Sequence, residues 1–323
     1  MKENTAFTVP QKEEEKSLPE KSSGFSKEGE AGSEEEAEKD IFSSLLLRWF
    51  SLHGRDLPWR EEPSPYHVWL SEVMLQQTQV ARVDGRWQRW LGRFPTPDAL
   101  AAADAADVLE EWQGMGYNRR ALSLWRAATQ VSDAGGVMPM DYQGLLSLPG
   151  IGPATAAGIR AFAYDLPGVY LETNVRTVFL HELYPDAVGV TDGELVPLVR
   201  STCPPDAHDG DDDPRTWYYA LLDYGAHLKR TLPNPSRRSA THTRQSRFEG
   251  SHRQKRAELV RLLLAHRTAD EDGAVDGEAL TEELSQLEEH AGRDRLSYGE
   301  VGSLLRELQK EGFCHKEGTK WWA

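Results

Sequence analysis

The sequence predicts an all-α fold. Apolar residues recur at helical spacing almost throughout residues 42–256, and no alternating pattern typical of a β-strand competes with them there. Proline, glycine and capping residues divide this span into separate helices. We expect these helices at residues 42–51, 65–80, 83–93, 99–112, 121–133, 153–164, 174–183 and 215–228, with a further helical turn around Leu145.

The two ends of the chain differ from this span in composition. Residues 1–40 are rich in Glu, Lys and Ser and lack apolar periodicity, which predicts a disordered acidic tail. Residues 257–323 predict a small winged-helix-like unit, because three amphipathic helices precede a hairpin. From Leu262 onward seven basic residues stand against fourteen acidic ones, so packing or partner binding is favoured over groove reading. The expected elements are helices at 258–267, 277–290 and 297–311 and a hairpin at 313–322.

Composition limits the class of protein. The chain has 323 residues, 39% hydrophobic content, a net charge of −15 and two cysteines. Two cysteines indicate a reducing compartment without a disulfide framework. The N-terminal segment resembles neither a secretory signal nor an arginine-rich transit peptide, and no stretch is long and apolar enough to cross a membrane. We therefore expect a monomeric cytoplasmic protein.

One predicted helix carries a glutamate inside an apolar face. Ser64 and Pro65 are a start signal, with a capping hydroxyl followed by proline at the first helical position. Glu72 lies one turn from Val68, so its carboxyl group should lose hydration and its pKa should rise, as a general acid near neutral pH requires. A buried glutamate neutralised by an arginine such as Arg60 is the alternative.

A glycine turn connects two other predicted helices. Residues 148–152 read LPGIG, and Pro153 can open the helix that follows. Gly150 and Gly152 permit backbone conformations barred to other residues and leave N–H groups uncovered at a helix N-terminus, where an anion such as DNA phosphate can bind. A packing turn is the alternative for this motif taken alone.

Together, several segments resemble MutY-type adenine DNA glycosylases of the helix-hairpin-helix (HhH-GPD) superfamily. The matching segments are RDLPWR at 55–60, EVMLQQT at 72–78, GMGY at 114–117, LPGIG at 148–152, NVR at 174–176 and FEGSHRQ at 248–254. The resemblance implies a glycosylase domain at residues 41–256 that acts on double-stranded DNA. It further implies a six-helix barrel at about 66–170, a second helical subdomain from 41–65 and 171–256, and a catalytic cleft between them.

The resemblance also implies roles for individual residues. Glu72 falls where the family has the acid that protonates adenine at N7. A glycosylase must extrude its target nucleotide, and polar amides and aromatic rings suit that task. The implied base-pocket and DNA-binding residues are Arg55, Trp59 and Arg60 on the pocket lining, Gln77 in the base stack, Met115 and Tyr117 on the wedge, and Leu148, Gly150, Gly152 and Asn174. For Met115 and Tyr117, a loop that packs on its neighbours is the alternative.

Two positions depart from the family pattern. The family's second catalytic carboxylate, an aspartate, aligns with Glu172, whose additional methylene moves the charge by about 1 Å; such a shift can cost around a hundredfold in rate. Glu172 can also cap the helix that begins near Asn174, and both roles are compatible. The nucleophilic lysine of relatives resembling endonuclease III aligns with Ala154, which predicts a monofunctional glycosylase without an efficient lyase step.

The cysteines also depart from the pattern. The family usually holds a [4Fe-4S] cluster through four cysteines, and four thiolates are the normal requirement for such a cluster. This chain has only Cys203 and Cys314, both outside the expected segment. We therefore expect no cluster, no zinc and no cofactor. The expected ligand positions fall near Arg230, Arg237, Ala240 and Ser246, and the nearby His227, His242 and His252 match no usual zinc spacing.

The segment that lacks the cysteines is strongly basic. Residues 229–261 contain ten Lys or Arg against two Glu, a net charge of +8 on an acidic chain. A concentrated positive charge is typical of a phosphate-contacting surface. We expect this loop, with Arg237, Arg238 and Arg244, to take over the DNA contacts of the cluster loop; a solvated surface loop is the alternative.

The expected function is hydrolytic removal of adenine mispaired with 8-oxoguanine or guanine, in base excision repair. The winged-helix-like unit does not resemble the C-terminal module with which many MutY-type enzymes check for 8-oxoguanine. Two alternatives therefore remain open: a glycosylase for T or U opposite G or for a damaged pyrimidine, and a catalytically silent DNA-binding relative.

Overall fold

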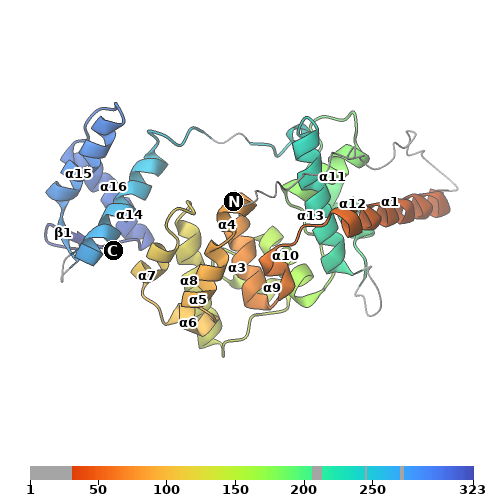
Figure 1. Cartoon of the computed structure of the whole chain (residues 1–323), viewed down its shortest axis with the longest axis horizontal. Helices are drawn as coiled ribbons and strands as arrows, with labels where there is room; N and C mark the ends of the chain where they lie inside the picture. Colours follow the sequence, from red (N-terminus) through yellow and green to blue (C-terminus); the bar gives the residue numbers. More distant parts are fainter. Residues whose placement is uncertain (1–30, 206–212, 244–245, 270–272) are drawn as a thin grey trace, which may run out of the picture.

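The computed structural model describes residues 31–205, 213–243, 246–269 and 273–323, with the backbone alone for residues 31–38 and 268–269. The described chain is mostly helical, as the sequence predicts. Figure 1 shows three parts along the long axis: a C-terminal unit, a helical barrel and a second helical subdomain. Residues 1–30 of the predicted tail, and Arg244, lie outside the described residues.

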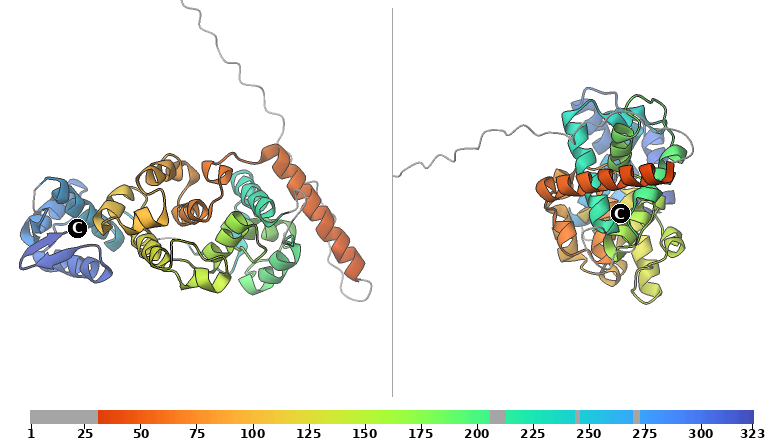
Figure 2. Two further views of the ribbon diagram at one scale, coloured as in Figure 1. Left: turned by 90° about the horizontal axis from the view of Figure 1, so that it is seen from below. Right: turned by 90° about the vertical axis from the view of Figure 1, so that its right-hand side faces the viewer.

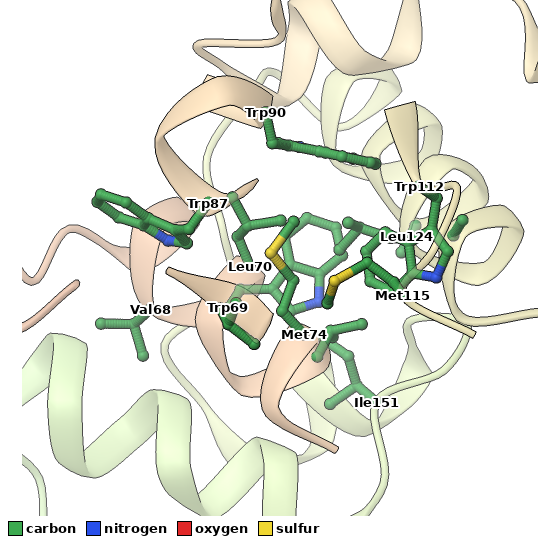
Figure 3. Packing of buried hydrophobic residues seen from close by; sticks show 14 of the residues in the cluster. Val68, Trp69, Leu70, Met74, Trp87, Trp90, Trp112, Met115, Leu124 and Ile151 are labelled. Carbon is green, nitrogen blue, oxygen red and sulfur yellow. The ribbon is translucent and has the colours of Figure 1, made fainter. Parts of the chain in front are cut away.

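The barrel surrounds a core that is rich in tryptophan. Trp90 meets Trp112 edge-on, with ring centroids 5.5 Å apart, and both rings are inaccessible to solvent. Figure 3 shows Met74 and Met115 pointing into the same core beside Trp69. The barrel helices are α3 (Pro65–Leu75), α4 (Val80–Val83), α5 (Arg86–Arg93), α6 (Pro97–Ala101), α7 (Ala105–Glu111), α8 (Arg119–Asp133), α9 (Tyr142–Ser147) and α10 (Pro153–Tyr164).

The second subdomain combines the start of the described chain with its later helices. The long helix α1 packs on α13 and lies at the end of the molecule away from the C-terminal unit (Figure 2). Trp49 of α1 meets Tyr224 of α13 edge-on at 5.1 Å between ring centroids. Its elements are α1 (Ala31–His53), α2 (Pro58–Glu61), α11 (Thr173–Glu182), α12 (Asp192–Thr202), α13 (Pro214–Thr231) and the 3₁₀ helix η1 (Pro235–Arg238).

Several predicted helix boundaries were wrong. Helix α1 begins at Ala31, so residues 31–40 are helical and do not belong to a disordered tail. Their Ala, Glu and Lys residues favour a helix, and their early acidic residues lie where the helix dipole favours negative charge. The helix expected at 65–80 ends at Leu75, and the one expected at 99–112 is divided into α6 and α7.

The C-terminal unit confirms the predicted order of three helices and a hairpin. Strand β1, which we did not predict, pairs with β3, so that the sheet order is β1-β3-β2 and every pairing is antiparallel. Helix α14 begins at His252, before the predicted boundary at residue 257. The elements are α14 (His252–Ala269), β1 (Val275–Asp276), α15 (Gly277–His290), α16 (Tyr298–Glu311), β2 (His315–Glu317) and β3 (Lys320–Trp322).

Charged contacts join the C-terminal unit to the barrel. Arg119 of α8 pairs with Glu311 of α16 at 2.6 Å, and Arg267 of α14 pairs with Asp107 of α7 at 2.7 Å. These two ion pairs place the C-terminal unit against α7 and α8 of the barrel.

No helix within the described ranges combines the length and apolarity that crossing a bilayer requires.

Candidate active site and DNA-binding surface

Helix α3 positions Glu72 as the sequence predicts. The Ser64 hydroxyl accepts a hydrogen bond from the backbone N–H of His67, and Pro65 occupies the first turn. The buried side chains Trp69 and Val73 hold the helix in the barrel core. Glu72 lies on the face of α3 that packs against α10.

The Glu72 carboxyl group lies in a tight, desolvated environment. Oε2 lies so close to Gly158 of α10 that a β-carbon on residue 158 would come within 2.4 Å of it. Tyr170 donates a long hydrogen bond of 3.4 Å from its hydroxyl group to Glu72 Oε1. Burial is the main cause that raises the pKa of Glu72 to about 8; the Tyr170 hydrogen bond opposes this shift and the negative charge of Glu172 adds to it. Glu72 therefore holds its proton at neutral pH.

Glu172 is the N-cap of α11 and lies near Glu72. Its Oε1 accepts hydrogen bonds from the backbone N–H groups of Asn174, at 2.5 Å, and Val175, at 3.1 Å. Burial raises its pKa, although these hydrogen bonds and the charge of Lys229 oppose the shift. The predicted capping role is thus present, and it brings the carboxylate close enough to Glu72 to act on its pKa.

Two further polar side chains near Glu172 were missed by sequence reasoning. The buried Tyr170 hydroxyl group interacts with both Glu72 and Glu172, whose charges contribute to raising its pKa after burial. Lys229 of α13 faces Glu172; burial lowers the pKa of this lysine, and the glutamate opposes the shift. Helix α13 approaches closely here, because a β-carbon on Gly225 would lie 2.2 Å from the Asn174 carbonyl oxygen.

One interpretation of the sequence has Arg60 neutralise Glu72. In the structure Arg60 instead binds Asp223 of α13, and Arg55 binds the same carboxylate. Arg55 donates from Nη2 to Oδ1 at 2.6 Å, and Arg60 donates from Nη2 to the same oxygen at 2.8 Å. Burial raises the pKa of Asp223, but the two guanidinium groups outweigh this effect and leave the pKa lower than usual. An aspartate within the otherwise apolar and aromatic run 217–226 was the signal that sequence reasoning overlooked.

The other predicted pocket residues lie close to this network. The Arg60 guanidinium stacks over the ring of Tyr219 at 4.3 Å. Trp59 is buried and meets Trp87 edge-on, with centroids 6.4 Å apart. Asn174 lies in the first turn of α11, and its Oδ1 is buried without a hydrogen-bond partner among the described residues. An unpaired buried acceptor costs free energy, so a ligand that donates to it would be stabilised.

The predicted hairpin joins α9 to α10. Leu148 is buried and anchors the turn, while Gly150 has a φ of 80° and Gly152 is the N-cap of α10. A side chain on Gly150 would collide with Ser123 of α8, because its β-carbon would lie 2.6 Å from the Ser123 β-carbon. Glycine is thus required both by the backbone conformation and by the contact with α8.

The structure separates the two predicted wedge residues. Tyr117 is exposed, whereas Met115 is 98% buried in the barrel core (Figure 3), as the alternative interpretation holds for Met115. Gln77, which we expect in the base stack, is also exposed. Gln77 and Tyr117 both have positive φ, at 52° and 50°, a strained conformation that costs about 1–3 kcal/mol and is concentrated at functional sites.

The basic loop after α13 has both an outward and an inward arginine. Arg237 is exposed, in agreement with a surface role. Arg238 is turned inward, where its guanidinium donates to the carbonyl oxygen of Leu180 in the last turn of α11 and to those of Tyr184 and Pro185 just after it. Because Nη1 and Nη2 of Arg238 already donate to the protein, this arginine is less available for the predicted DNA contact than the exposed Arg237.

The residues in this loop do not fit an iron-sulfur cluster. The segment in which thiolates would be needed contains Arg238 and the buried Ser236 and Ser239 instead. The side-chain oxygen of Asn234 accepts hydrogen bonds from the backbone N–H and the hydroxyl group of Ser236. Cys314 is buried in the C-terminal unit. Among the described residues, no group of three His, Cys, Asp or Glu side chains is placed to hold a metal ion. Hydrogen bonds to Arg238 hold the loop to α11.

Comparisons with known proteins support the resemblance. Residues 70–202 match the family model of the HhH-GPD superfamily base excision DNA repair protein. The chain is 45% identical over 142 residues to an adenine DNA glycosylase of Mycobacterium tuberculosis (strain CDC 1551 / Oshkosh), which is 43% of this chain and 47% of that relative. It is 39% identical over 183 residues to an adenine DNA glycosylase of Mycolicibacterium smegmatis, which is 56% of this chain and 61% of that relative.

The match is partial in length but extends to the fold. The chain spans about half the length of the curated relatives it matches. A solved structure of a thermostable thymine-DNA glycosylase aligns with 59% of this chain and 88% of its own, at 22% identity and a TM-score of 0.51. The two helical subdomains therefore have the architecture of that glycosylase.

Proposed function

Because residues 70–202 match the HhH-GPD superfamily of base excision DNA repair proteins, we propose that this chain is a glycosylase of that superfamily and that it hydrolyses the N-glycosidic bond of adenine mispaired with 8-oxoguanine or guanine. The proximity of a protonated Glu72 to the capped carboxylate of Glu172 carries the proposal. The adenine glycosylases among its relatives supply the choice of base.

Each carboxyl group has a step suited to its protonation state. Glu72 donates its proton to adenine N7, so that the bond from C1′ to N9 breaks and the electron pair leaves with a neutral base. The anion of Glu172 stabilises the positive charge that develops on the sugar. Because two backbone N–H groups bind Oε1 of Glu172, the longer side chain is held in one position and the rate need not fall by the full cost of a misplaced charge.

Ala154 supports a reaction that ends at the abasic site. It lies at the start of α10 beside the hairpin and has no nucleophile to attack the sugar. Excision should therefore leave an intact strand that breaks only after alkali. A duplex nicked without alkali by the purified protein would contradict the monofunctional assignment.

The exposed basic residues of the loop after α13 supply phosphate contacts. Arg237 is exposed and therefore available for such contacts, and Arg244 is added from the sequence alone. Charge reversal of both should weaken binding to duplex DNA and flatten the dependence of affinity on salt. Unchanged affinity and an unchanged salt slope would exclude the loop from the DNA-binding surface.

Single-turnover excision from three duplexes tests the function. The targets are A opposite 8-oxoguanine, A opposite G, and T or U opposite G, each followed by alkali. Release of adenine that is lost in Glu72→Gln, with DNA binding retained, is the expected result. Release of T or U would identify a pyrimidine glycosylase, and tight binding without product from any duplex would identify a silent relative.

A further inference from the structure

Two loops that are both bound by Arg120 contain strained residues. The first loop, residues 76–79, follows α3 and contains Gln77; the second, residues 112–118, connects α7 to α8 and contains Tyr117. Both residues are exposed and have left-handed backbone conformations. Such conformations persist only where the surrounding structure holds them.

One side chain, Arg120, binds both loops. Its Nη1 donates to the carbonyl oxygen of Gln76 at 2.6 Å and to that of Val73 at 2.8 Å. Its Nη2 donates to Thr78 Oγ1 at 3.1 Å and to the carbonyl oxygen of Gly116 at 3.1 Å. Each strained residue therefore lies next to residues that this guanidinium holds.

Stacking fixes the orientation of the same guanidinium. Arg120 lies over the ring of Trp112 at 5.2 Å and over that of Tyr117 at 5.5 Å. Burial lowers its pKa to about 10, so it remains charged at neutral pH. Because the donors of Arg120 are already bound by the two loops, Arg120 is poorly suited to contact a DNA phosphate. The neighbouring Arg119 does not share this role, since it is exposed and pairs with Glu311.

We propose that Arg120 is a positioning residue that holds Gln77 and Tyr117 as one rigid unit, so that both enter the DNA together when the target base is extruded. This inference rests on the proposed function, because it describes how the two loops distort base-paired DNA during excision. A planar fork of donors can span two loops, whereas the compact ammonium group of a lysine cannot reach both.

Excision by Arg120→Lys on paired and unpaired targets tests the inference. On adenine opposite 8-oxoguanine in a paired duplex, the single-turnover rate should fall at least tenfold. On adenine in a single-nucleotide bulge, which is already unstacked, it should fall less than threefold. Arg126→Lys is the matched control, because Arg126 lies on the same helix and also binds a backbone carbonyl, that of Glu311. Equal losses on both targets in Arg120→Lys would overturn the inference.

Hydrogen exchange supplies a readout that does not require excision. In Arg120→Lys, backbone amides of residues 76–79 and 112–118 should exchange faster together, while those of α10 remain unchanged. Faster exchange in only one loop, or in neither, would show that Arg120 does not couple them. If the unmodified protein releases no base, the proposed function fails, whereas this measurement still decides the coupling.

Discussion

The carboxyl group of Glu72 lies directly against Gly158, at a distance that leaves no room for a β-carbon on residue 158. Glycine within a helix is unfavourable compared with alanine, so its presence in α10 requires a compensating contact. Here that contact is the Glu72 carboxyl group of α3, and the Tyr170 ring packs on the same spot. The position of the proposed acid therefore depends on the presence of a glycine, which has no side chain, at residue 158 of the neighbouring helix.

Gly158→Ala should displace Glu72 and slow base excision. A displacement of about 1 Å in a catalytic group can cost around a hundredfold in rate. We expect a single-turnover rate at least tenfold lower, with a loss of stability of about 1–3 kcal/mol from overpacking. Gly92→Ala in α5 is the matched control, since a β-carbon there meets nothing within 4 Å. An unchanged rate in Gly158→Ala would show that Glu72 does not need this position.

The rate of excision should fall as pH rises through about 8. Glu72 donates a proton in the proposed mechanism, and its pKa of about 8 means that the active, protonated form is lost above that pH. At low pH the rate should fall again as Glu172 becomes protonated, because its anion is needed. Single-turnover rates between pH 5 and 10 on one duplex measure both limbs. A rate that increases steadily above pH 8 would contradict the role of Glu72 as acid.

Tyr170→Phe should move the basic limb of this profile to higher pH. The Tyr170 hydroxyl group lowers the pKa of Glu72 by donating to its carboxylate, so removing it should let that pKa rise. Tyr164→Phe serves as the control, because its hydroxyl group lies on the same helix as Gly158 but donates to the Met138 carbonyl oxygen. A basic limb that stays in place, or moves to lower pH, would show that the Tyr170 hydroxyl group does not lower the pKa of Glu72.

Asp223→Asn should destabilise the second subdomain. Removing one partner from a buried ion pair costs about 3–5 kcal/mol, and here Arg60 would remain buried without its carboxylate. The folded-state pKa of Asp223 lies below the ordinary value, so its stabilisation is present above that value and is lost as pH falls through the folded-state pKa. Urea unfolding at neutral and acidic pH should show a difference between the two proteins that shrinks in acid.

Arg238→Met should destabilise the loop after α13, whereas Arg237→Met should not. Removing the Arg238 guanidinium leaves several carbonyl oxygens without a charged donor, at a cost of about 2–3 kcal/mol. The adjacent Arg237 is exposed, so its substitution should change stability by less than about 0.5 kcal/mol. The free energy of unfolding of the two variants provides the comparison. Equal values would show that Arg238 is not what holds the loop.

Local patterns allowed the Glu72 helix, the hairpin and the capping position of Glu172 to be predicted. Each depends on residues within a few positions of one another, such as Ser64 with Pro65. The difference in burial between Met115 and Tyr117 could not be predicted, because both are large side chains in one loop and nothing in the local sequence shows which one faces the core. Arg237 and Arg238 pose the same problem, since only the end of α11 determines which one turns inward.

Asp223 and β1 show a second limit of the sequence. Asp223 meets Arg55 across a separation of 168 residues, and no local pattern reveals such a partner. Strand β1 has only two residues, and its pairing with β3 determines that it is a strand at all. Contacts between distant segments therefore account for most of what sequence reasoning missed.

The packing of α1 on α13 has a consequence for synthesis of the protein. Phe42, Leu46 and Trp49 leave the ribosome early, but their partners in α13 emerge only after the whole barrel has been translated. Until then Phe42 and Trp49 lack their partners Trp217 and Tyr224, and exposed apolar surfaces favour aggregation. Nascent chains halted before Pro214 should therefore depend on chaperones, whereas those that have released α13 should not.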